Sequence, residues 1–153
     1  MKSTQLIFLL STLTAFTTAE FCQWTMQRVS DDDPKPGAYK NAGKVLLNRD
    51  CDLGDYKHSV ASLDLNSCIE NRGGKFVAVD NGNAFSSCDV YTCSFGDNNS
   101  IECGDCGQAN GKISIPIDDV AKAVGKNGEN AACFTHTVTA TTSTYSMVPT
   151  GSH

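Results

Sequence analysis

Histidine, positive charge and long hydrophobic runs are all scarce in this sequence. None of its three histidines, His58, His136 and His153, has the spacing of a zinc motif or a catalytic triad. Twelve Lys and Arg residues against 17 Asp and Glu give a formal net charge of -5. This charge argues against nucleic acid and against anionic membranes, since both require a basic surface. We therefore expect no enzyme, no metal or other cofactor, no nucleic-acid partner and no membrane partner.

The longest hydrophobic run lies at the N-terminus and is too short for a transmembrane helix. It follows Lys2, extends from Leu6 to Phe16 with Ser and Thr interruptions, and gives way to small residues up to Ala19. A bilayer span takes about 20 apolar residues, whereas this pattern is typical of a secretory signal peptide. The sequence thus predicts a signal peptide over residues 1–19, followed by a secreted, extracellular protein.

Cysteine, in contrast, is abundant, and all eight cysteines follow the predicted cleavage site. An even count in an exported chain predicts four disulfides, each worth about 2–4 kcal/mol. Two other uses compete, because Cys103-Gly104-Asp105-Cys106 has the form of a redox dithiol and four cysteines fall between 88 and 106, enough for zinc. Export favours disulfides over both. The cysteines are Cys22, Cys51, Cys68, Cys88, Cys93, Cys103, Cys106 and Cys133.

Many short strands with turn signals at close spacing predict an all-β fold. Residues 117–124 are the only helical-looking piece. Residues 31–43 combine prolines, glycines and an acidic run, which favours a solvated loop over a calcium site. Residues 135–153 are rich in Ser and Thr and are predicted to form a C-terminal tail, in which 135–139 alternates like a strand. The candidate strands are 44–48, 58–65, 75–79, 90–93, 100–103 and 112–117.

The most informative feature is a match of the chain to itself. Cys51 is followed 14 residues later by Leu65, and Cys103 is followed 14 residues later by Ile117. Leu65 and Ile117 each lie in a segment whose apolar residues are two positions apart. In each segment two polar residues follow, and further along there is a turn that contains Asn and Gly. We infer a single domain over residues 20–134, built from two repeats at about 21–76 and 84–130.

Equivalent positions in two repeats should form equivalent disulfides. This argument predicts Cys22–Cys51 and Cys88–Cys103, and it leaves Cys93–Cys106 and Cys68–Cys133 for the remaining four cysteines. The rival is a nested pair, Cys88–Cys106 with Cys93–Cys103. The nested pair fits a simple hairpin centred near Asp97 but breaks the repeat.

The residues of the first repeat resemble a known family. The segment Ser62-Leu63-Asp64-Leu65-Asn66-Ser67-Cys68-Ile69-Glu70-Asn71, closed by Gly74, is similar to the first-repeat motif of the cyanovirin-N homology (CVNH) family. The resemblance covers about residues 21–130. It implies a pseudo-symmetric, disulfide-rich all-β fold in which each repeat is a triple-stranded sheet plus a β-hairpin. Family members are typically lectins for mannose-α1,2-linked glycans, and they occur in filamentous fungi, which fits an exported fungal protein.

The resemblance also implies two shallow sugar pockets that hold mannose-type oligosaccharides by hydrogen bonds, without metal or chemistry. The alternative is that the same residues are ordinary exposed polar groups. For the second-repeat pocket the implied residues are Glu70, Asn71, Asn83, Ser86, Ser87, Asp105 and Gln108. For the first-repeat pocket they are Asp52, Gly54 and Tyr56, faced by Asn127 and Glu129.

Departures from the family motivate a second hypothesis. The first repeat has 29 residues from cysteine to cysteine against 15 in the second, and four cysteines are extra. A secreted cysteine-rich effector or other protein-binding module, with sugar binding lost, would tolerate such changes. Asn98-Asn99-Ser100 is a predicted N-glycosylation acceptor. Residues 80–83 are the natural hinge between the repeats, so a monomer and a domain-swapped dimer both stay open.

Overall fold

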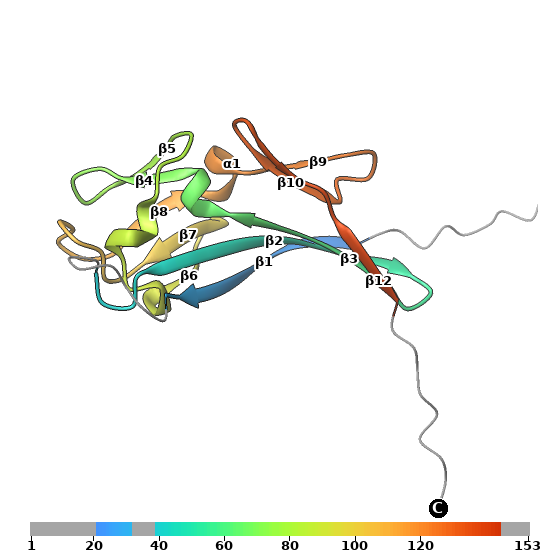
Figure 1. Cartoon of the computed structure of the whole chain (residues 1–153), viewed down its shortest axis with the longest axis horizontal. Coiled ribbons are helices and arrows are strands. Elements are labelled where there is room, and N and C mark those ends of the chain that lie inside the picture. The colour runs from blue at the N-terminus through green and yellow to red at the C-terminus, as the bar shows by residue number, and fades with distance from the viewer. Residues whose placement is uncertain (1–20, 32–38, 145–153) are drawn as a thin grey trace, which may run out of the picture.

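We describe the fold from a computed structural model, in which residues 21–31 and 39–144 are placed well enough to describe (Figure 1). The predicted signal peptide, most of the 31–43 loop and residues 145–153 of the predicted tail lie outside the described residues. Among the described residues, no helix has the length and apolarity needed to cross a membrane.

The first repeat is a three-stranded antiparallel sheet followed by a hairpin. Its sheet consists of β1 (Phe21–Ser30), β2 (Gly43–Gly54) and β3 (Lys57–Asp64). The Asp64 side chain then accepts a hydrogen bond from the Asn66 backbone and starts a 3-10 turn, η1 (Leu65–Ser67). The hairpin consists of β4 (Ile69–Asn71) and β5 (Phe76–Ala78).

The second repeat has the same order of elements. After the 3-10 turns η2 (Ala84–Ser87) and η3 (Val90–Thr92), the sheet is formed by β6 (Cys93–Gly96), β7 (Ser100–Cys103) and β8 (Ile113–Pro116). A one-turn helix, α1 (Ile117–Val120), leads into the hairpin of β9 (Lys122–Val124) and β10 (Asn130–Cys133). The prediction of an all-β, disulfide-rich fold is therefore confirmed.

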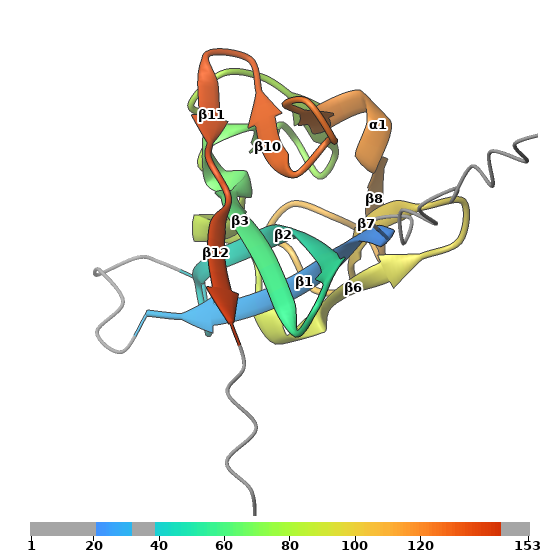
Figure 2. The ribbon, with the colours of Figure 1, turned by 90° about the vertical axis from the view of Figure 1, so that its right-hand side faces the viewer.

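Each hairpin packs on the sheet of the other repeat. Strand β10 packs against β2 and β3, and β5 packs against β8. Figure 1 shows the β9–β10 hairpin above the first sheet and the β4–β5 hairpin above the second, and Figure 2 shows the same layering from the side. The fully buried side chains Leu47, Leu63, Phe85, Ile101 and Ile117 come from both repeats and belong to one core cluster. Neither repeat can bury its apolar face alone.

Two strands extend the fold into the Ser/Thr-rich segment that the sequence assigns to the tail. Strand β11 (His136–Val138) pairs with β10, and β12 (Thr141–Thr144) pairs with β3 at the edge of the first sheet. The alternating pattern of residues 135–139 predicts the first of these strands, β11. The second has four exposed Ser and Thr residues, so its sequence carries no core-facing pattern.

Some element predictions are wrong. Residues 90–93 were expected to form a strand, but Asp89 accepts a hydrogen bond from the Tyr91 backbone and starts the turn η3 instead. The helix expected over 117–124 ends at Val120, because the chain becomes extended again in β9. Strand β1 was not predicted, although Cys22, Trp24 and Met26 alternate with polar residues as a half-buried strand requires.

All eight cysteines are bonded, and two of the four predicted pairs need correction. The predictions Cys88–Cys103 and Cys93–Cys106 are wrong, because the register of the β6–β7 hairpin places Cys93 opposite Cys103, and a separate antiparallel bridge places Cys88 opposite Cys106. Hairpin register thus overrides the repeat, and the redox and zinc uses of these cysteines find no support. The bonds in the structure are Cys22–Cys51, Cys68–Cys133, Cys88–Cys106 and Cys93–Cys103.

Loop length predicts which of these bonds stabilises most. The separation of 65 residues for Cys68–Cys133 corresponds to about 4.3 kcal/mol of loop entropy, and that of 10 residues for Cys93–Cys103 to about 2.7 kcal/mol. All four sulfurs are buried, so the two Cys→Ala pairs leave similar cavities. We expect C68A/C133A to lower the free energy of unfolding in urea by about 1.6 kcal/mol more than C93A/C103A. An equal or reversed loss would contradict the loop argument.

Candidate functional site

Several residues predicted for the second-repeat pocket lie near one another, and most are already engaged in hydrogen bonds or ion pairs within the protein. The Asn71 side-chain amide donates to the Ser87 hydroxyl at 2.9 Å and to the Gly107 carbonyl at 3.0 Å. Its oxygen accepts from the Gly74 backbone at 3.1 Å. Asn71 therefore acts as a clamp between its own turn and the segment that follows Cys106.

Tyr39, from the end of the 31–43 loop, lies over the same place. Its hydroxyl donates to the Asp105 carboxylate, and its backbone N–H donates to the Ser86 carbonyl at 3.3 Å. A Cβ atom built on Gly107 would lie 3.8 Å from the Tyr39 ring. The hydrogen bond to Asp105 is the main cause that raises the pKa of Tyr39 above its usual 10.0. Tyr39, which belongs to the segment predicted to be a solvated loop, thus covers part of the predicted pocket.

The remaining members of this set are less central. Glu70 pairs with Arg72 at 2.7 Å. Asn83 starts η2 in the left-handed region, and Gln108 is exposed with a φ of 68°. The structure thus brings Asn71, Ser86, Ser87 and Asp105 together, but as a bonded cluster that closes turns.

The Tyr39 contact can be tested by titration. Because folding raises the pKa of Tyr39, its contribution to stability is present below the unfolded value near 10 and is lost as the pH rises through the folded-state pKa. In ultraviolet absorbance, we expect Y39F to remove a tyrosinate step that lies above the usual 10.0. A raised step that survives in Y39F would contradict the contact.

The residues predicted for the first-repeat pocket divide between two hollows. Asp52 and Tyr56 line a hollow of ≈ 520 Å³ at the β2–β3 turn, whereas Asn127 and Glu129 line a different one of ≈ 260 Å³. Successive side chains of a strand point to opposite faces, so Asp52 lines the first hollow and Leu53 the second. The four residues therefore lie around two hollows on either side of β2.

The smaller hollow, which we call the Glu129 hollow, is lined by more polar side chains than the hollow at the β2–β3 turn. It lies where the β9–β10 turn meets the first sheet and the chain between β11 and β12. Six of its eight lining residues are polar, and the two apolar ones, Leu53 and Ala140, supply a hydrophobic surface. Its lining is Leu53, Ser59, Asn127, Glu129, Asn130, Thr139, Ala140 and Thr142.

Glu129 is held as an acceptor in this hollow. Its carboxylate accepts a hydrogen bond from the Asn127 backbone at 2.9 Å. Its own backbone N–H and that of Asn127 both lower its pKa, so the group is ionised at neutral pH. Gly125 at φ +98° makes this possible, because a Cβ there would lie 3.0 Å from a Glu129 oxygen.

Ser59 is the most unusual residue of the lining. It is 2% exposed, and its hydroxyl has no hydrogen-bond partner among the described residues. Buried polar groups are nearly always paired, because an unpaired one costs about 1–3 kcal/mol. The sequence did not predict four of the lining residues, because no local sequence pattern identifies a serine in a strand or a polar tail as part of a site. These residues are Ser59, Asn130, Thr139 and Thr142.

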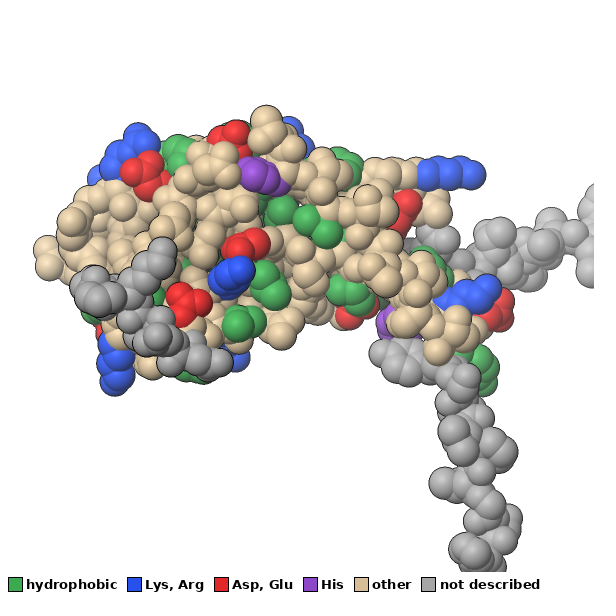
Figure 3. Space-filling model, in the orientation of Figure 1, with side chains coloured by type: hydrophobic (Ala, Val, Ile, Leu, Met, Phe, Trp, Pro, Cys, Tyr) green, Lys and Arg blue, Asp and Glu red, His purple; other side chains and the backbone are tan. Residues whose placement is uncertain are grey.

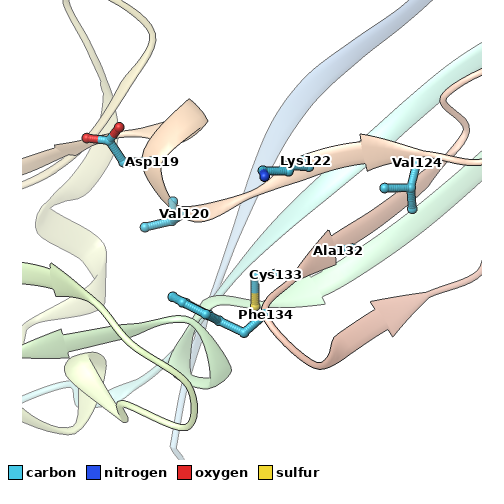
Figure 4. Close-up of a pocket in the computed structure, with 7 residues that line it drawn as sticks. All are labelled: Asp119, Val120, Lys122, Val124, Ala132, Cys133 and Phe134. Atoms are coloured by element: carbon cyan, nitrogen blue, oxygen red, sulfur yellow. The ribbon is translucent and has the colours of Figure 1, made fainter.

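Two further hollows contain none of the predicted residues. One, of ≈ 390 Å³, lies between α1, β9 and β10 beside Phe134, which is 55% exposed and has a φ of 49° (Figure 4). The other, of ≈ 410 Å³, lies between β1 and β6 and is lined by Trp24 and Phe95 among others. The lining surface of both is more strongly apolar than that of the Glu129 hollow.

Comparison with known proteins decides the family. The model of the CVNH domain matches residues 37–130, which is more than half of the 153-residue chain. This chain belongs to the CVNH family. The CVNH family is of lectin type and is associated with carbohydrate binding. No curated protein and no solved structure matches the chain. The CVNH match ends at Asn130, so Thr139 and Thr142 of the Glu129 hollow lie beyond it.

Proposed function

We propose that this protein is a secreted, lectin-like member of the CVNH family that binds mannose-type oligosaccharides in the Glu129 hollow. The observation that supports this most directly is the fixed, ionised Glu129 carboxylate beside Asn127 and Asn130 in a polar hollow. Sugar hydroxyls both donate and accept, and carboxylates and amides are the side chains that can meet them in pairs.

The strength of binding follows from the number of hydrogen bonds. Each is worth about 0.5–1.5 kcal/mol net, or about 1.5–3 kcal/mol where one partner is charged. Three or four of them support a Kd on the order of 1 mM for one sugar ring. The second-repeat cluster is engaged internally, so we propose one working site for each chain and little avidity from a single molecule.

Export is supported by the same features of the chain. Four disulfides persist in an oxidising compartment and are rare in the cytosol. Asn98, the predicted glycosylation site, is exposed in the turn between β6 and β7. On the face in Figure 3, acidic and basic side chains are interspersed, without a large basic area that would attract phosphates.

A second candidate function, protein binding by an exported effector, is supported by exposed aromatic side chains. Tyr91 is 56% exposed, Phe134 55% and Phe95 41%. Aromatic residues are enriched at protein interfaces, and two of these line hollows. If the mature protein binds nothing on a glycan array but captures a protein through these residues, the result would favour this function over the lectin.

Substitutions of two carboxylates distinguish between the two candidate sites. We expect E129Q to weaken binding of methyl α-D-mannopyranoside by about 10-fold in calorimetry, because a charge-assisted hydrogen bond worth about 1.5–3 kcal/mol is replaced by a neutral one worth about 0.5–1.5 kcal/mol. The matched control is E70Q, in the second-repeat set, where Glu70 is already paired with Arg72. Full affinity in E129Q together with a loss in E70Q would move the site to the second repeat.

A further inference from the structure

We infer that Ser59 and Thr142, a cross-strand pair, are sugar-binding residues, and that β12 completes the Glu129 hollow as a pocket for one terminal, neutral sugar ring. The inference rests on the proposed function and specifies what its site recognises. Neither residue belongs to the sites implied by the family resemblance, and Thr142 lies outside the family match.

Ser59 provides the first argument. Ser59 lines the hollow from β3, and its buried hydroxyl has no hydrogen-bond partner within residues 21–31 and 39–144. An unpaired buried hydroxyl destabilises the fold, so its presence calls for a partner that the described residues do not supply. A ligand hydroxyl in the hollow would be such a partner.

The register of β12 provides the second argument. Thr142 lies directly opposite Ser59, and side chains opposite one another in an antiparallel pair share one face. Both residues line the hollow, whereas Thr141 and Ser143, which are opposite Val60 and His58, do not. Strand alternation thus places two hydroxyls side by side at the hollow and supplies two neighbouring controls.

The wall that carries Thr142 is fixed by further contacts. The Ala140 backbone N–H donates to the Asn130 side chain at 2.8 Å, and Val138 is opposite Ala131 in the sheet of β10 and β11. The resulting hollow of ≈ 260 Å³ is smaller than the range of about 300–1,000 Å³ that holds drug-sized ligands. This volume suits one ring at the end of a glycan better than an internal stretch.

The charge and polarity of the lining define the class of sugar. Leu53 and Ala140 offer apolar surface to the C–H groups of a ring, while Ser59, Thr142 and Glu129 offer partners to its hydroxyls. Ionised Glu129 would face the carboxylate of an acidic sugar without a basic side chain among the described lining residues to offset it. The hollow therefore selects neutral sugars against uronic acids.

The test uses the mature full chain and two probes, methyl α-D-mannopyranoside and methyl α-D-glucuronide. Calorimetry should give binding of the mannoside only, a loss of about 5-fold or more in S59A and T142V, and unchanged affinity in T141A and S143A. Amide NMR shifts during the mannoside titration should be largest around Ser59, Thr142 and Glu129.

Thermal unfolding supplies a readout that a merely structural role would not give. Removal of an unpaired buried hydroxyl should raise the Tm of ligand-free S59A by a few degrees while its affinity falls. A lower Tm in S59A would show that the hydroxyl serves the fold, and it would overturn the inference.

Other outcomes are equally decisive. If the wild type binds the mannoside and both S59A and T142V bind it as well, the inference fails while the lectin function stands. If glucuronide binds as tightly as mannoside, the charge selection fails. If the wild type binds no neutral sugar, the proposed function fails and this inference fails with it.

Discussion

The contact of each hairpin with the sheet of the other repeat is the constraint on which the rest of this structure depends. The β9–β10 hairpin covers β2 and β3, and the β4–β5 hairpin covers β8, so one core receives side chains from both repeats. A sheet that is apolar on one face must bury that face, and here each repeat does so only with its counterpart. The same contact brings the β9–β10 turn to the first sheet and so creates the Glu129 hollow.

The two repeats share an order of elements but differ in what covers them. At the second-repeat set, Tyr39 and Asn71 close the turns by hydrogen bonds. At the first sheet, β12 adds an edge strand whose Thr142 borders a hollow instead of filling it. A duplicated scaffold therefore carries two unequal surfaces, which is expected when function resides in sites and not in the fold.

The topology could be predicted from the sequence because it follows from distances between residues that are close along the chain. The 14-residue distances from Cys51 to Leu65 and from Cys103 to Ile117 each begin in the second strand of a sheet, include the third, and end at the first residue of the short helical turn that follows. The nested disulfides were not predicted correctly, because a hairpin register is set by the turn and the repeat says nothing of it. In the site, Asn127 and Glu129 were predicted and lie in the hollow, whereas Asp52 and Tyr56 face another one. Ser59 and Thr142 are distant in sequence and meet only through strand pairing, so no local pattern could link them.

The disulfide Cys68–Cys133 has a consequence for assembly. It joins the end of η1 to the end of β10, and residues 80–83, the predicted hinge between the repeats, lie inside the covalent ring that it closes. In a dimer that exchanged its halves at this hinge, Cys68 of one molecule would meet Cys133 of the other. A monomer and such an exchanged dimer would therefore be separate covalent species, fixed when the sulfurs oxidise, and neither dilution nor crowding would convert one into the other while the bond is intact.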